Sequence, residues 1–129
     1  MNKTFSFDLF DQMPVVGIMR NIPDEYIEDI AGVYCRSGLT NLEITMNSPN
    51  AEQNISLLAD LYGDKLNIGA GTVCSMTDLE KALNAKAQFI VTPIINEEVI
   101  KTCVTEKIPI FPGAYTPSEI YKAWSLVHP

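Results

Sequence analysis

The stretch Leu42-Glu43-Ile44-Thr45 decides the fold, because it is a short apolar strand interrupted by a carboxylate and a hydroxyl. Successive side chains of a strand point to opposite faces, so Leu42 and Ile44 share one face while Glu43 and Thr45 share the other. A carboxylate is costly to bury unless it is paired or hydrogen-bonded. The pattern therefore predicts a buried strand with one polar face, such as the lumen side of a parallel barrel provides.

Four continuous apolar runs lie on either side of this strand, as expected for strands that are covered on both faces. They are residues 15–19, 66–70, 89–92 and 108–111. The spacing between runs is that of one strand plus one helix, and the intervening segments repeat apolar residues with helical periodicity. Five such units predict an α/β fold with a parallel sheet and right-handed crossovers, either open and doubly wound or part of a closed barrel.

Several residues are expected to begin helices. Ser48 can cap the helix that follows the second strand. Thr116 with Glu119, and Thr77 with Glu80, match the capping box, in which a hydroxyl and a carboxylate satisfy backbone groups of the first turn. We therefore give Thr116 a structural role and no catalytic one.

The composition limits the classes of function. The 129 residues are 47% hydrophobic with a formal charge of -7 and a pI near 4.5, which fits one domain spanning residues 1–129 and disfavours nucleic-acid or anionic-membrane partners. The three cysteines form no closely spaced pair, and the single histidine, His128, argues against metal ligation and against a Ser-His relay. No apolar stretch reaches membrane-spanning length and no signal segment is evident, so we expect a cytoplasmic protein without a cofactor.

Polar residues at strand ends are the candidate site, because chemistry in a βα barrel gathers at the carboxyl ends of the strands. Arg20 ends the first run, Glu43 and Thr45 lie in the second, Thr72 follows the third, and Thr92 ends the fourth. These residues favour the barrel, although a closed barrel typically needs about 250 residues. Glu43 could act as a general acid/base or form a structural ion pair, and Thr72 could bind a carboxylate or cap the next helix.

Five blocks taken together resemble the 2-keto-3-deoxy-6-phosphogluconate / 4-hydroxy-2-oxoglutarate aldolase family. They are Pro14-Val-Val-Gly-Ile-Met-Arg20, Leu42-Glu-Ile-Thr45, Gly69-Ala-Gly-Thr-Val73, Phe89-Ile-Val-Thr-Pro93 and Pro112-Gly-Ala-Tyr-Thr-Pro-Ser-Glu119. Their order and spacing match the family along essentially the whole chain. The resemblance implies an eight-stranded βα barrel, of which about five units are present, and a homotrimer.

The resemblance also implies a class I aldolase, in which a lysine forms a Schiff base with the pyruvate carbonyl. By position, Glu43 would move protons, Thr72 would hold the carboxylate of a small keto-acid substrate, and Arg20 would contact the substrate's anionic end. Thr45 and Thr92 are further candidate substrate-binding residues. Asn47 stands where many members of the family carry an arginine.

The family's Lys-x-Phe-Pro strand should follow Trp124, where this sequence reads Ser125-Leu-Val-His-Pro129. None of the lysines lies inside an apolar run; they are Lys3, Lys65, Lys81, Lys86, Lys101, Lys107 and Lys122. Solvated lysines with an ordinary pKa are poor amine nucleophiles. We therefore predict no retro-aldol activity for this chain alone. Two alternatives are a non-catalytic remnant that serves as a scaffold or oligomerising piece, and a sugar-phosphate isomerase barrel.

Overall fold

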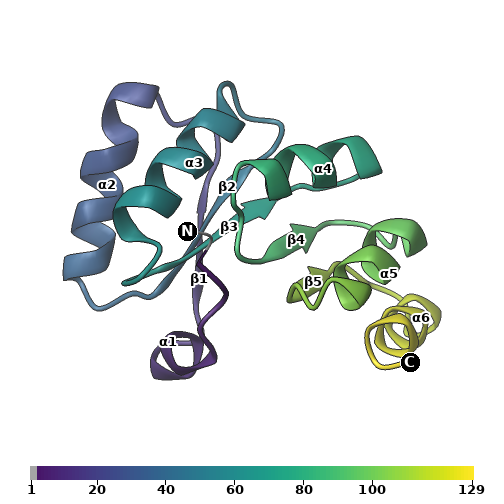
Figure 1. Ribbon diagram of the computed structural model, residues 1–129. Coiled ribbons are helices and arrows are strands. Elements are labelled where there is room, and N and C mark those ends of the chain that lie inside the picture. Colours follow the sequence, from purple (N-terminus) through teal and green to yellow (C-terminus); the bar gives the residue numbers. More distant parts are fainter. Residues whose placement is uncertain (1–2) are drawn as a thin grey trace.

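The computed structural model describes residues 3–129 and contains the five βα units in strict alternation (Figure 1). The strands are β1 (Val16–Met19), β2 (Asn41–Thr45), β3 (Asn67–Gly71), β4 (Ile90–Thr92) and β5 (Ile110–Pro112). The helices that follow them are α2 (Asp24–Arg36), α3 (Ala51–Tyr62), α4 (Met76–Asn84), α5 (Glu97–Thr105) and α6 (Pro117–Val127). Each apolar run thus becomes a strand, displaced by no more than two residues at its start.

The strand order distinguishes the barrel from the open sheet. All described pairs are parallel, and the order is β1-β2-β3-β4-β5, so every strand lies beside its neighbours in sequence. In a doubly wound sheet the order of the strands reverses at a switch point, and the described sheet has no such reversal. Figure 1 shows α2 to α6 on one side of a curved sheet. The fold is an arc of a parallel βα barrel, and the predicted fold class is confirmed.

The core lies between the sheet and these outer helices. Leu42 and Ile44 of β2 and Ile68 and Ala70 of β3 point toward it and are at most 2% exposed. They pack against helix side chains such as Ile55, which is fully buried. Alternation then sends Glu43 and Thr45 to the concave face, as the sequence predicted.

The short helix α1 (Phe7–Gln12) lies alone on the concave side of the sheet (Figure 1). Its segment is fastened to polar side chains at the amino ends of the strands. The side chain of Asn67 accepts a hydrogen bond from the Ser6 N–H at 2.7 Å and donates to the Ser6 carbonyl at 2.8 Å, and Gln88 donates to the Thr4 carbonyl at 3.1 Å. The N-terminal segment therefore plugs the amino-terminal end of the lumen.

Aromatic rings complete this plug. Phe5 stacks edge-on against Phe89 with the ring centroids 5.7 Å apart, and Phe10 lies 5.8 Å from Phe111. The ring of Phe89 occupies the space that a Cβ at Gly69 would need, so glycine at this position is what lets the ring lie against β3. The amino-terminal end of the lumen is therefore lined by aromatic rings as well as by the polar side chains that fasten the N-terminal segment.

The helix starts agree only in part with the sequence patterns. The capping box of Thr116 and Glu119 is confirmed. The predicted box of Thr77 and Glu80 is wrong, because Ser75, two residues earlier, caps α4 by accepting from the Asp78 N–H. The predicted cap at Ser48 is also wrong. Asn50 is the N-cap residue of α3, and the Ser48 hydroxyl bonds elsewhere.

Candidate active site at the carboxyl ends of the strands

Glu43 is the central residue of the candidate site. It lies in the middle of β2, is 3% exposed, and has one carboxylate oxygen, Oε2, with no hydrogen-bond partner. Burial raises the pKa of Glu43 from 4.5 to about 7, although the nearby Arg20 guanidinium acts in the opposite direction. Near neutral pH this side chain can therefore both hold and release a proton, as a general acid/base must.

Gly71 makes room for this carboxylate. A Cβ at Gly71 would overlap the carboxylate group of Glu43 on the neighbouring strand. Gly69, the register partner of Glu43, is in turn covered by the Phe89 ring. The glycines of the Gly69-Ala-Gly-Thr sequence thus shape the lumen around Glu43, because one leaves room for the Phe89 ring and the other leaves room for the carboxylate.

Arg20 and Thr72 meet at the carboxyl ends of the strands, near Glu43, although they follow strands that are not neighbours. Arg20 comes directly after β1, Thr72 directly after β3, and the Arg20 Nη2 donates to the Thr72 Oγ1 at 3.1 Å. Thr72 adopts a left-handed backbone conformation with φ of 55°. A β-branched residue in this region is strained, and such strain gathers at functional sites.

Thr45 lies on the same face as Glu43, but its hydroxyl already has a partner. It is fully buried and lies 2.6 Å from the Ser48 hydroxyl. The Ser48 hydroxyl also accepts from the Asn21 N–H at 2.9 Å. Ser48, which the sequence pattern assigned to a helix cap, therefore ties the end of β2 to the residue after Arg20.

Thr92 is not brought into this group. It shares the outer face of β4 with Ile90, and it is 1% exposed. Its hydroxyl donates to the Ile94 carbonyl at 3.1 Å and so closes the turn after the strand. The structure thus places Arg20, Glu43 and Thr72 together, Thr45 on the same face two residues further along β2, and Thr92 on the other face of the sheet.

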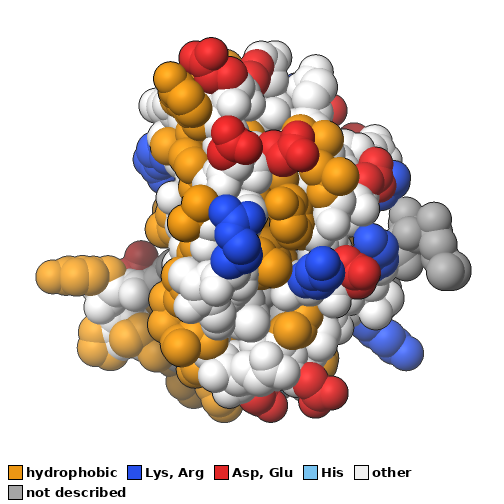
Figure 2. All heavy atoms as spheres, turned by 90° about the vertical axis from the view of Figure 1, so that its left-hand side faces the viewer, with side chains coloured by type: hydrophobic (Ala, Val, Ile, Leu, Met, Phe, Trp, Pro, Cys, Tyr) orange, Lys and Arg blue, Asp and Glu red, His pale blue; other side chains and the backbone are white. Residues whose placement is uncertain are grey.

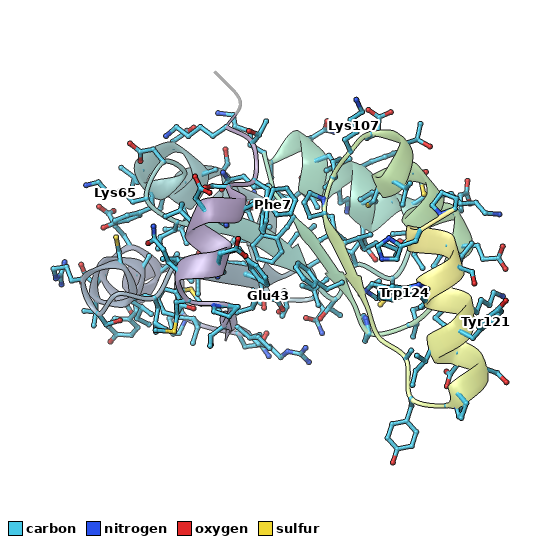
Figure 3. The ribbon with its side chains drawn as sticks, turned by 90° about the horizontal axis from the view of Figure 1, so that it is seen from below. Phe7, Glu43, Lys65, Lys107, Tyr121 and Trp124 are labelled. Atoms are coloured by element: carbon cyan, nitrogen blue, oxygen red, sulfur yellow. The ribbon has the colours of Figure 1, made fainter. Side chains whose placement is uncertain are left out.

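The lysines of the described chain lie away from Glu43. Figure 3 shows Lys65 and Lys107 at the amino-terminal edge of the sheet, with Glu43 toward the opposite edge. Lys86 pairs with Asp60 at 2.8 Å, and Lys101 and Lys122 both pair with Glu97 on the outer layer. Lys3 donates to carbonyls of α3, and Lys81 lies on α4. Lys81 lines a pocket together with Ser48, but no hydrogen bond or ion pair joins a lysine among residues 3–129 to Glu43.

Among residues 3–129, no group of three or more His, Cys, Asp or Glu side chains could hold a metal ion. No helix in this part of the chain is long and apolar enough to cross a membrane.

Known proteins resemble this chain in both sequence and structure. The family model described as KDPG and KHG aldolase matches residues 8–127. The 2-dehydro-3-deoxy-6-phosphogalactonate aldolase of Escherichia coli (strain K12) is 38% identical over 113 residues, which are 87% of this chain and 55% of the relative. The chain spans about half the length of the curated relatives it matches.

Two solved structures superpose closely. A structure described as native KDPGal has a TM-score of 0.85 at 35% identity, and the match covers 89% of this chain and 56% of that one. The second is KDPG aldolase from Legionella pneumophila with pyruvate captured at low pH as a covalent carbinolamine intermediate. It has a TM-score of 0.83 at 26% identity, and the match covers 92% of this chain and 57% of that one. The chain belongs to the KDPG and KHG aldolase family.

Proposed function

We propose that this chain supplies the acid/base and carboxylate-binding part of a class I aldolase. The reaction would cleave a 2-keto-3-deoxy sugar acid phosphate or 4-hydroxy-2-oxoglutarate into pyruvate and an aldehyde, through a lysine Schiff base. The observation that carries the proposal is the buried Glu43 carboxylate with its unbonded oxygen beneath Arg20 and Thr72. The family membership supports the same class of reaction.

Each residue has a role that follows from its chemistry. The Thr72 hydroxyl and the Arg20 guanidinium are hydrogen-bond donors that suit the carboxylate of pyruvate, and at present they bond to each other. Glu43, with a pKa near 7, would transfer protons during carbinolamine dehydration and the enamine step. Thr45 and Ser48 would hold the loop that carries Arg20.

The Schiff-base amine must come from a lysine outside the described site, because the lysines here lie on the outer layer or at the amino ends of strands. The carbinolamine in the Legionella relative is an adduct of an amine and a carbonyl, which supports amine chemistry for the family. We therefore propose that the chain alone binds a keto acid without cleaving it. Homotrimeric assembly and a cytoplasmic location stay predictions.

Pyruvate binding tests this function directly. Titrating pyruvate into ¹⁵N-labelled protein should shift the amide resonances of Thr72 and its neighbours, with a dissociation constant on the order of millimolar for so small a ligand. Thr72→Val should weaken binding about tenfold, since it removes one hydrogen bond to a charged group. Thr105→Val is the matched control, because Thr105 bonds only to its own helix.

Two outcomes would contradict the proposal. Absence of pyruvate binding at tens of millimolar, or binding that Thr72→Val leaves unchanged, would remove the assigned carboxylate site. Borohydride reduction in the presence of pyruvate should leave the mass of this chain unchanged. A covalent adduct on one of its lysines would show that the amine is here after all.

A further inference from the structure

The loop between β1 and α2 carries Arg20 and is bonded to the loop that follows the next strand. This Arg20 loop is residues 20–23, and the loop between β2 and α3 is residues 46–50. Directly after Arg20, the Asn21 N–H donates to the Ser48 hydroxyl at 2.9 Å. Asn21 has a left-handed backbone conformation with φ of 54°, and the chain bends there as it leaves β1. The start of the Arg20 loop is therefore fixed against the loop that follows β2.

Asp24 fixes the other end of the Arg20 loop. Its carboxylate, in the first turn of α2, accepts from the Asn50 Nδ2 at 2.6 Å and from the Asn54 Nδ2 at 2.9 Å. These hydrogen bonds, from Asn54 first and then from Asn50, lower the pKa of Asp24, so the carboxylate is charged at neutral pH. Each of its two oxygens thus has a partner at the start of α3.

Asn50 bonds to Asp24 instead of capping its own helix. It is the N-cap residue of α3, a position where an asparagine side chain usually accepts a hydrogen bond from an N–H of the first turn. The Asn50 side chain makes no such bond, and its backbone is left-handed with φ of 55°. The missing cap bond lowers the stability of α3, which indicates that the contact with Asp24 serves the Arg20 loop and not the helix.

The contact is not needed to hold α2 against α3. Ile27 of α2 and Ile55 of α3 belong to the same buried cluster and are at most 1% exposed, so apolar packing already joins the two helices. Asp24 itself is exposed. Figure 2 shows this face of the molecule, with several acidic side chains at its upper end, where α2 begins. A polar contact between exposed groups adds little to the stability of the fold, so its effect on the Arg20 loop is the larger one.

We propose that Asp24, with its two asparagine partners, is a positioning residue that holds the Arg20 loop where the guanidinium reaches the carboxylate of the substrate. The inference rests on the proposed function, in which Arg20 and Thr72 bind that carboxylate. With both ends of the loop fixed, the guanidinium is in place before the ligand arrives, and binding has to order fewer groups. Without Asp24, the loop keeps only the Asn21 contact and the packing of Ile22 on the core.

Asn50→Gly separates positioning from stability, because it removes a contact with Asp24 without removing a helix cap. Glycine adopts φ of 55° freely, so the Tm of this variant should be no lower than that of the natural chain. Its affinity for pyruvate, measured by titration of the ¹⁵N-labelled protein, should nevertheless fall about threefold. An Asn50→Gly protein that melts at a lower temperature and binds pyruvate normally would show that the contact is structural and would overturn the proposal.

Asp24→Ala removes both contacts and should weaken pyruvate binding about fivefold. Glu25→Ala is the matched control, because it removes the same charge from the same turn of α2, and it should leave binding unchanged. Equal weakening by the two variants would mean that charge matters and not the bonds to α3. In an Arg20→Ala background, adding Asp24→Ala should cause no further loss, since the group that Asp24 positions is gone. A further loss as large as in the natural chain would reject the proposal.

A measurement without pyruvate distinguishes this inference from the proposed function. Burial raises the pKa of Glu43 and the Arg20 guanidinium opposes that rise, so a displaced Arg20 should let the pKa of Glu43 rise further. The ¹³C shift of the Glu43 carboxyl carbon, followed against pH, should show this rise in Asp24→Ala and not in Glu25→Ala. If the natural chain does not bind pyruvate but the rise is seen, the proposed function fails and the positioning of Arg20 stands. A pKa of Glu43 that Asp24→Ala leaves unchanged overturns the positioning in either case.

Discussion

The two ends of the lumen use polar side chains in opposite ways. At the amino-terminal end, Asn41, Asn67 and Gln88 are buried, and their side chains bond to one another or to backbone groups. At the carboxyl-terminal end, Glu43 has an unbonded oxygen and Thr72 has a strained backbone. Both ends bury polar groups, but only one satisfies them internally.

This difference separates structure from function within one sheet. A buried polar group that lacks a hydrogen-bond partner lowers the stability of the fold, so such groups are found mainly at functional sites. The amides at the amino end fasten the N-terminal plug and need no ligand. The groups at the carboxyl end remain available for a ligand, in agreement with the place of chemistry in βα barrels.

The largest expected change in stability comes from removing a hydrogen-bonding side chain at the amino-terminal end of the lumen. Asn67→Ala removes hydrogen bonds to both backbone groups of Ser6 and to Asn41, at 2.7 to 2.9 Å. Because it leaves buried partners unsatisfied, it should lower the free energy of unfolding by about 4 kcal/mol in urea titrations. Asn84→Ala, at an exposed helix end, should change it by less than about 0.5 kcal/mol. A stable Asn67→Ala protein that has lost pyruvate binding would reverse the assignment of the two ends.

The second effect is a pH dependence that belongs to the carboxyl end. The pKa of Glu43 is higher in the folded chain, at about 7, than its ordinary value of 4.5. The folded state therefore binds the extra proton between these values, and the stabilisation present below pH 4.5 is lost as the pH rises through 7. The total loss is about 3 kcal/mol from the size of the shift.

Comparison with Glu43→Gln isolates this contribution. The free energy of unfolding of the natural chain, relative to that of Glu43→Gln, should fall between pH 4.5 and pH 7 and stay constant at higher pH. Glu80→Gln on the exposed side of α4 provides the control for a general change of charge. A pH profile that is the same in all three proteins would mean that Glu43 titrates normally and that the site lacks its acid/base.

The strands and the position of Glu43 could be predicted from the sequence. The contacts between residues of different strands could not. The five strands follow from apolar runs, and the position of Glu43 follows from alternation within β2. The contact between Arg20 and Thr72 could not be derived, because it depends on the curvature of three strands. The strand order itself needed the resemblance or the structure, since apolar runs alone also allow an open sheet.

The differences between pattern and structure have local physical causes. Thr92 is a candidate by position because it ends a strand, whereas its alternation with Ile90 places it on the outer face. Ser48 resembles a helix cap in sequence, but Thr45 and Asn21 compete for its hydroxyl. A cap pattern shows that a hydroxyl can accept a hydrogen bond, and it does not show which N–H reaches it first.

A smaller effect is expected from filling the space around Glu43. Gly71→Ala places a methyl group where the Glu43 carboxylate lies, so the carboxylate must move out of its buried position. Overpacking of this kind should lower the free energy of unfolding by about 2 kcal/mol at pH 6. The pKa of Glu43, followed by the ¹³C shift of its carboxyl carbon, should fall toward 4.5. A pKa that stays near 7 would show that the carboxylate is buried elsewhere.

The smallest expected effect comes from relieving backbone strain at Thr72, and it is a gain in stability instead of a loss. Thr72→Gly removes a β-branched residue from φ of 55°, a conformation that glycine adopts freely, so it should raise the free energy of unfolding by about 0.5 to 1 kcal/mol. Lys107→Gly relieves the same strain at φ of 58° near the amino end and should raise it equally. Only Thr72→Gly should weaken pyruvate binding. Equal stability gains with unequal binding would show that strain at the carboxyl end is kept for the ligand, whereas equal binding would make Thr72 as structural as Lys107.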